Sequence, residues 1–278
     1  MEITTLIGFV AALAAILFGI SFGSDGIDFG NLMNFFDPTS LFIVIGGTIF
    51  VLLASFPLKY FLNIPKHFKA IIKKGSGNSL EYVEIITELS REARKKGLLA
   101  LEDKANAFED QFLKESVLLI VDAIEPEKLK LWFAQKLEYI EKRNDDERSF
   151  YDSGAALAPA FGMLGTLIGL INMLKSMNLE GGAESLGSDM SVALITTFYG
   201  SFLANVFFTP MSTHLAIAQQ RELLLKEMII EGVISIKEGE NPKYIQEKLM
   251  NFLDPKEISG GEGGKKKKGK GDGGGGDE

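Results

Sequence analysis

Hydroxyl and amide side chains recur inside two long apolar stretches of this sequence, where polar groups are rare. In the stretches at 153–174 and 190–220 they are Thr166, Asn172, Thr196, Thr197, Tyr199, Ser201 and Asn205. Pro159 and Pro210 interrupt the same stretches, and a proline inside a helix frees a backbone carbonyl. Hydroxyls and freed carbonyls surrounded by lipid need a partner or a water-filled cavity. The pattern therefore predicts a polar pathway between these two stretches.

Ionisable side chains are missing from these stretches. Neither they nor the apolar stretches at 3–21 and 38–58 contain Asp, Glu, Lys or Arg, and His214 lies near the end of the last one. A proton relay in a membrane usually uses an ionisable group. Gly162, Gly165 and Gly169 would let another helix approach closely, although the glycines alone fit plain packing equally well. With the hydroxyls they predict a surface around a helix of another chain, which brings the missing carboxylate.

Other chemistry finds little support in the sequence. Cysteine is absent and the two histidines, His67 and His214, are far apart, so we expect no metal site. Phosphate-binding loops (GxxxxGK[ST]), HExxH and GxSxG motifs are also absent, and we expect neither an enzyme nor a cofactor. The net charge of −8 argues against nucleic acid as a partner.

Four uncharged stretches are long enough to cross a bilayer. They cover residues 3–21, 38–58, 153–174 and 190–220. The first is not preceded by a basic segment, which favours a retained span over a cleaved signal peptide. Core helices of a soluble bundle would keep a polar face, which these stretches lack. We predict an all-α polytopic membrane protein with four transmembrane helices and a helical cytoplasmic domain between spans two and three.

The distribution of lysine and arginine predicts the orientation. The loop after the first span carries Asp25, Asp28 and Asp37 without a basic residue, whereas five lysines follow the second span at 59–74. Because cytoplasmic loops are enriched in basic residues, both termini and the long middle segment should be cytoplasmic.

Helical periodicity continues outside the spans, so we expect the charged segments at 59–150 and 221–254 to extend the membrane helices into a compact body. Ser79 and Gly97 should bound one helix, with Arg94 in its last turn and Glu102 opening the next. Pro126 should open another helix, whose apolar stripe is Leu129, Trp132, Phe133, Leu137 and Ile140. Residues 117–121 should be buried in the body. The predicted domains are 1–60 and 151–220 in the membrane, 61–150 and 221–258 in the cytoplasm, and a disordered tail at 259–278 rich in Gly and Lys.

Three motifs resemble one family. APAFGMLGTLIG at 158–169, TTFYG at 196–200 and GLLALE at 97–102 are similar to sequences of the MotA/PomA flagellar stator subunits, and the resemblance extends over about residues 1–255. It implies a bacterial inner-membrane protein that forms a pentamer around two copies of a MotB-type single-span protein. The transmembrane Asp of that partner carries the ion, and the complex turns ion-motive force into rotor torque.

The resemblance also assigns roles to individual residues. Pro159 and Pro210 match functional prolines, Thr197 and Thr166 match threonines that face the pore, and Arg94 and Glu102 match charges that contact the rotor protein FliG. Thr196 beside Thr197 offers a second hydroxyl oxygen, which a dehydrated Na⁺ would need. We nevertheless expect H⁺ to be the coupling ion, because one hydroxyl pair is weak evidence for sodium.

Two other readings stay open. An ExbB/TolQ-type energy transducer shares the glycine- and threonine-bearing last spans, but those proteins have one span before the cytoplasmic domain, whereas this chain has two. A membrane adaptor without ion flow would leave the intramembrane hydroxyls unexplained.

Overall fold

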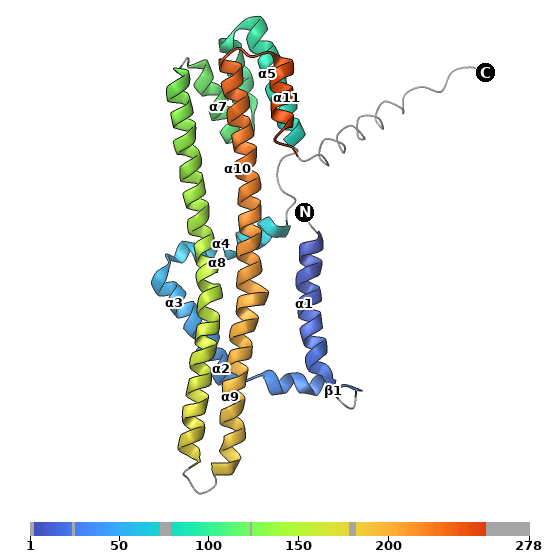
Figure 1. Cartoon of the computed structure of the whole chain (residues 1–278), viewed down its shortest axis with the longest axis vertical. Helices are drawn as coiled ribbons and strands as arrows, with labels where there is room; N and C mark the ends of the chain where they lie inside the picture. The colour runs from blue at the N-terminus through green and yellow to red at the C-terminus, as the bar shows by residue number, and fades with distance from the viewer. Residues whose placement is uncertain (1–2, 24–25, 73–78, 123, 178–181, 254–278) are drawn as a thin grey trace, which may run out of the picture. The chain divides into compact units, whose positions relative to one another are not determined.

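The computed structural model describes residues 3–23, 26–72, 79–122, 124–177 and 182–253, which are almost entirely helical (Figure 1). The all-α prediction is confirmed. The chain divides into two compact units. We call residues 1–75 and 143–218 the span unit, and residues 76–142 and 219–278 the body unit. Helices α8 (Pro126–Ser176) and α10 (Thr209–Lys237) each contribute residues to both.

The span unit begins with the apolar helix α1 (Ile3–Ser21). Two short antiparallel strands, β1 (Phe22–Gly23) and β2 (Gly26–Ile27), lead to the 3-10 helix η1 (Phe29–Phe35). Two acids that the sequence places in this loop are helix caps. Asp28 accepts a hydrogen bond from the Gly30 amide at 2.8 Å, and Asp37 accepts one from the Ser40 amide at 2.7 Å. Each satisfies a backbone donor that the first turn of a helix leaves unpaired.

The second apolar stretch is one helix made of α2 (Pro38–Leu41), the π-helical η2 (Phe42–Gly46) and α3 (Gly47–Ser55). It ends three residues earlier than predicted. Phe56 is extended (φ −126°, ψ 141°), because the following Pro57 disfavours the helical conformation at the residue before it. The charged segment therefore starts a separate helix, α4 (Leu58–Ile72), and the expectation that it extends the second span is wrong.

The third and fourth apolar stretches do continue as helices beyond their predicted ends. The third lies in α8, which is 51 residues long, and the fourth passes from α9 (Gly182–Phe202) through the π-helical η4 (Leu203–Phe208) into α10. Among the described residues, three helical stretches are long and apolar enough to cross a membrane: Pro38–Ser55, Pro126–Ser176 and Leu186–Lys237. A shorter apolar helix covers Ile7–Ser21, so the total of four spans stays a prediction.

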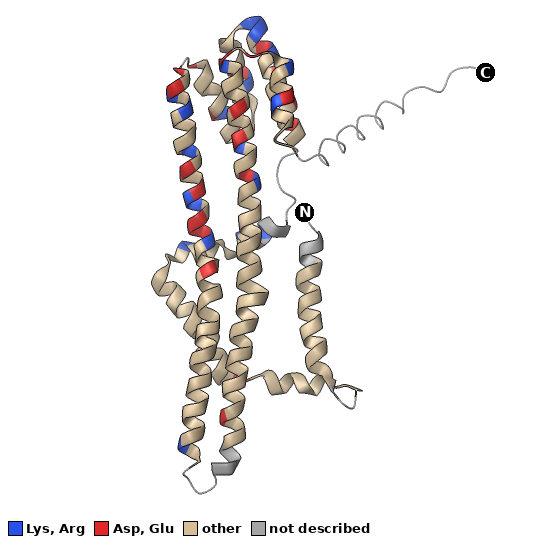
Figure 2. Ribbon diagram, in the orientation of Figure 1, with Lys and Arg blue, Asp and Glu red and all other residues tan. Residues whose placement is uncertain are grey.

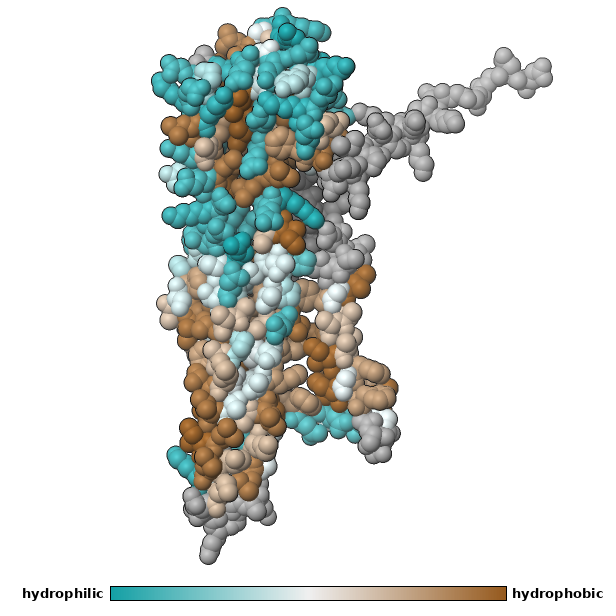
Figure 3. Space-filling view, viewed as in Figure 1, coloured by the Kyte–Doolittle hydropathy of each residue, from teal (hydrophilic) through white to brown (hydrophobic). Residues whose placement is uncertain are grey.

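The body unit has an aliphatic core made by amphipathic helices. These are α5 (Ser79–Lys96), the 3-10 helix η3 (Leu98–Leu101), α6 (Glu102–Ala107), α7 (Gln111–Val121), α11 (Pro242–Met250) and the adjoining parts of α8 and α10. The core includes Val83, Ile86, Leu113, Val117 and Ile245, each at most 1% exposed. The surface of the body unit is largely hydrophilic, whereas the span unit shows mostly apolar side chains (Figure 3).

Several helix boundaries in the body unit confirm the sequence analysis. Helix α5 ends at Lys96 with Arg94 in its last turn, Glu102 opens α6, and Pro126 opens α8. Of the predicted stripe on α8, Leu129 and Phe133 are buried, while Trp132 is 38% exposed. The stretch at 117–121 lies in the core. The tail at 259–278 lies outside the described residues.

Candidate functional site

The shortest polar contact between the third and fourth apolar stretches joins two threonines. The hydroxyl oxygens of Thr166 on α8 and Thr197 on α9 are 2.6 Å apart. Thr166 also lies 3.0 Å from the carbonyl oxygen of Ala193, and Thr197 lies 3.3 Å from the same oxygen. Thr197 is exposed and Thr166 is partly exposed in this chain. The structure thus brings together two of the hydroxyls that the sequence analysis assigned to the predicted pathway.

Glycines bring the two helices close enough for this contact. A Cβ atom on Gly200 would lie 2.6 Å from the Ala158 carbonyl oxygen, and one on Gly162 would lie 3.0 Å from the Thr196 carbonyl oxygen. At Gly165 a Cβ atom would meet the Thr196 side chain at 2.4 Å. Helices in lipid associate through such small residues because their backbones can then make van der Waals contact.

Thr196 is placed differently from its neighbour Thr197. Its side chain is fully buried against Gly165, and its hydroxyl donates to the carbonyls of Val192 and Ala193, at 2.9 and 3.0 Å. In this chain the hydroxyl beside Thr197 is therefore that of Thr166. The two adjacent threonines do not offer a pair of oxygens to one ion, because successive helical residues point about 100° apart.

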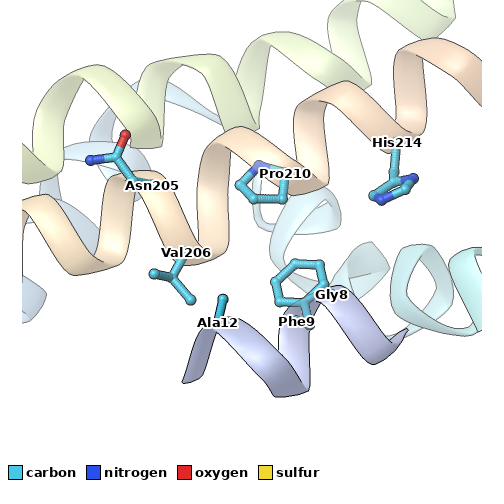
Figure 4. Close-up of a pocket in the computed structure, with 7 residues that line it drawn as sticks. All are labelled: Gly8, Phe9, Ala12, Asn205, Val206, Pro210 and His214. Carbon is cyan, nitrogen blue, oxygen red and sulfur yellow. The ribbon is translucent and has the colours of Figure 1, made fainter. Parts of the chain in front are cut away.

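Neither proline ends its helix. Pro159 lies inside the continuous helix α8, partly exposed and against Gly200, whose added Cβ atom would come within 3.2 Å of the proline Cα. Pro210 is the second residue of α10, which follows the π-helical η4, and the wider turns of η4 adapt the backbone to a residue that cannot donate. Pro210 also lines an apolar pocket with Val206, facing Phe9 and Ala12 of α1 (Figure 4). No pattern in the sequence predicted this contact with α1.

Two of the other polar side chains serve local structure. Tyr199 donates its hydroxyl to the carbonyl oxygen of Phe35, which ties α9 to η1. The amide of Asn205 donates to the carbonyl of Ser201 on the preceding turn, at 2.9 Å. Both contacts lie within the chain and pair the Tyr199 hydroxyl and the Asn205 amide nitrogen with backbone carbonyls.

A buried polar cluster near the start of the third apolar stretch escaped the sequence analysis. The Nδ1 atom of His67 on α4 lies 2.9 Å from the Tyr151 hydroxyl, and its Nε2 atom lies 3.4 Å from a Glu147 carboxylate oxygen. Tyr151 is fully buried and His67 is 9% exposed. Glu147 and Tyr151 are neighbours on α8, but His67 is 84 residues from Tyr151 in sequence, on α4. Only the fold brings His67 to the other two. No group of metal-ligating side chains occurs among the described residues.

The charges predicted to act on the rotor flank one turn of the body unit. Arg94 and Glu102 are both exposed, and Gly97 between them has a positive φ of 87°. The neighbouring charges are paired instead: Lys104 contacts Glu88 at 2.9 Å and also binds Glu92, which Lys96 contacts at 3.1 Å. Hydrogen bonds from Lys104 and then Lys96 lower the pKa of Glu92. The charged side chains concentrate on the body unit (Figure 2).

Comparisons with known sequences agree with this arrangement. Residues 104–228 match the model of the MotA/TolQ/ExbB proton channel family. The chain is 38% identical to motility protein A of Treponema phagedenis, over 92% of this chain and 96% of that one. It is 38% identical to motility protein A of Borreliella burgdorferi, over 93% and 96% of the two chains. The chemotaxis protein PomA of Vibrio alginolyticus is 30% identical over 91% of this chain and 96% of its own.

Solved structures resemble most of the chain. A chain of the C. jejuni MotAB structure superposes with a TM-score of 0.80 at 27% identity, covering 92% of this chain and 97% of that one. A chain of the flagellar MotAB stator complex from Bacillus subtilis gives a TM-score of 0.79 at 30% identity, with coverage of 92% and 97%.

Proposed function

We propose, from the premise that this chain belongs to the motility protein A family and is a flagellar motor stator subunit, that H⁺ passes along the surface around Thr166 and Thr197. The partner is a MotB-type single-span protein whose transmembrane Asp carries the ion. The complex is a ring of five copies of this chain around two partner helices, in the bacterial inner membrane with both termini in the cytoplasm. The two related structures are those of MotAB complexes, which supports such a partner.

The observation that carries the proposal is the Thr166–Thr197 hydroxyl pair. It lies 2.6 Å apart on a partly exposed face of helices whose apolar stretches contain no carboxylate. Exposed hydroxyls in such a stretch are costly against lipid. A neighbouring helix with a carboxylate would cover this face and supply the ionisable group. Pro159 is on the same face of α8, one heptad from Thr166, and we assign both to the partner surface.

The choice of H⁺ rests on the position of Thr196. A dehydrated Na⁺ needs several oxygen ligands, and the Thr196 hydroxyl is buried against Gly165, away from the exposed face that carries Thr197. Thr196 and Pro210 shape the pathway through packing in this proposal. Cells that express this stator should swim in sodium-free medium, and loss of swimming upon sodium removal alone would assign Na⁺ instead.

Ion flux tests the proposal directly. The chain co-reconstituted with its partner should conduct, and the chain alone should not. Thr197→Val should reduce the flux at least tenfold. Thr213→Val is the matched control, since Thr213 is exposed on α10 and donates only to the Thr209 carbonyl of its own helix, at 3.0 Å. Flux from the chain alone, or equal loss in both variants, would contradict the proposal.

Arg94 and Glu102 are proposed to transmit force to the rotor protein FliG. Both are exposed at the ends of helices in the body unit, away from the apolar stretches in sequence. Exposed charge pairs are worth about 0 to 1 kcal/mol, weak enough to form and release repeatedly. Arg94→Glu should stop swimming while flux and assembly persist, and an opposite reversal on the rotor should restore motion. Arg91→Glu, three residues earlier and also exposed, is the control.

An ExbB/TolQ-type transducer is the alternative, since the matching family model covers those proteins too. The identity to motility protein A over 92% of this chain includes the N-terminal region and favours the stator. Deletion of the gene should abolish swimming and leave energised outer-membrane import intact.

A further inference from the structure

We infer that Asp152, held by Ser212, is a second cation site on this chain, at the end of the pathway next to the charged part of α8. This inference rests on the proposed ion flux and extends it. The Ser212 hydroxyl on α10 donates to an Asp152 carboxylate oxygen on α8 at 2.5 Å. Ser212 is 7% exposed, whereas the side chain of Asp152 is 56% exposed. The carboxylate is thus fixed from one side and open on the other.

The position of Asp152 on α8 links it to the threonine pair. Asp152, Pro159 and Thr166 are each seven residues apart on an uninterrupted helix. Since seven residues fall about 20° short of two turns, the three lie within about 40° of one another around the helix axis. The helix rises 1.5 Å per residue, so Asp152 is roughly 20 Å from Thr166 along the axis, about two thirds of a hydrocarbon core.

The segment between Asp152 and Thr166 contains no other ionisable side chain. Residues 153–174 contain no ionisable side chain, so Asp152 is the first carboxylate of α8 on this face beyond the threonine pair. Two hydrogen bonds therefore start from one stripe of α8: Thr166 pairs with Thr197, and Asp152, just before the third apolar stretch, accepts from Ser212 of the fourth. A carboxylate at this distance suits a cation that leaves the partner's carboxylate and must reach water.

Arg148 is the charge that faces Asp152 most closely on its own helix. Its Nε atom lies 3.6 Å from Asp152, while an Nη atom lies 3.2 Å from Asp145. One arginine shared by two carboxylates leaves a net charge of −1, so the cluster still attracts a cation. A purely structural ion pair is the competing explanation. It predicts equal effects for the two acids, because both are 56% exposed and share the same arginine.

The two acids therefore supply a matched pair of variants. Asp152→Asn keeps an oxygen that accepts from Ser212 but removes the charge, and Asp145→Asn removes a charge that has no hydroxyl from α10. Both would be reconstituted with the partner in vesicles of known orientation, with proton flux measured in each direction. Conduction by the unmodified complex tests the proposed function separately.

We expect Asp152→Asn to lower the flux about tenfold and to raise the half-saturating proton concentration only for entry from the Asp152 side. Asp145→Asn should stay within twofold of the unmodified complex. Ser212→Ala, which keeps the carboxylate but frees it, should lower the flux about threefold. Unchanged flux in Asp152→Asn, an equal loss in both Asn variants, or a symmetric change in both directions would overturn the inference. If Asp152→Asn does not assemble, Asp152→Glu, which keeps the charge, should retain the half-saturating proton concentration of the unmodified complex in both directions, and unchanged flux in Ser212→Ala would overturn the inference.

Discussion

The span unit and the body unit are both helical, but their helices are held together in different ways. In the body unit, amphipathic helices bury branched aliphatic side chains and present charges to solvent. In the span unit, α8 and α9 approach through glycines, and its buried cluster is built around the aromatic residues Phe150, Tyr151 and Phe208. Lipid is as apolar as leucine, so helix association there depends on close packing and hydrogen bonds. Large-to-small changes should therefore damage the body unit, and small-to-large changes the span unit.

The largest effect is expected from a cavity in the body unit. Phe133→Ala removes a side chain that is 1% exposed, which should cost about 3 to 5 kcal/mol of stability. Leu131→Ala on the same helix, where Leu131 is 60% exposed, should cost less than about 1 kcal/mol. Thermal unfolding of the purified protein, followed by circular dichroism, measures both. Similar losses for the two variants would mean that this core does not stabilise the unit.

The reverse substitution probes the span unit. Gly200→Ala would force a Cβ atom to 2.6 Å from the Ala158 carbonyl oxygen, an overpacking that should cost about 1 to 3 kcal/mol. Gly187→Ala on the same helix meets nothing within 4 Å and should be neutral or slightly stabilising, because alanine favours helix. The thermal stability of the reconstituted complex distinguishes them. A tolerated Gly200→Ala would show that the two helices can separate at little cost.

A smaller effect should follow from loss of one buried hydrogen bond. Tyr151→Phe leaves the ring in place but removes the hydroxyl that lies 2.9 Å from His67. The expected cost is about 1 kcal/mol. Tyr139→Phe is the control, since Tyr139 is 73% exposed on the same helix. Denaturation midpoints that are identical for both variants would indicate that His67 finds a substitute partner.

The smallest effect concerns a partly buried ion pair of the body unit, between Glu115 and Lys136. Hydrogen bonds from Lys136 and then from Gln111 lower the pKa of Glu115. A lowered pKa in the folded state adds stability above the unfolded value, near 4.3, and this stability disappears as the pH falls through the folded value. Between about pH 7 and pH 3, the melting temperature of the unmodified protein should therefore decrease more than that of the Glu115→Gln variant. Parallel pH curves would contradict the pairing.

The same contrast explains what the sequence could predict. In the body unit, period and caps located α5, Gly97 and the start of α8, because an amphipathic helix records its buried face in the sequence. In the span unit the helices are apolar on most of their surface, so the sequence located the helices but did not indicate that Thr196 is buried and Thr197 exposed. The end of α3 at Ser55 could have been read from Pro57, since the preceding residue is restricted. The His67–Tyr151 contact depends on the placement of α4, for which the sequence has no signal.

The backbone conformation at Gly97 also sets the distance between Arg94 and Glu102. Its φ of 87° is strained for any residue with a Cβ atom, although a Cβ atom there would meet nothing within 4 Å. The spacing between Arg94 and Glu102 is thus fixed by one corner of the main chain rather than by side-chain rotation. In the proposed function, these two charges would therefore meet the rotor protein at a constant separation. Gly97, which carries no charge, would in this way determine the spacing at which Arg94 and Glu102 contact the rotor in the proposed function.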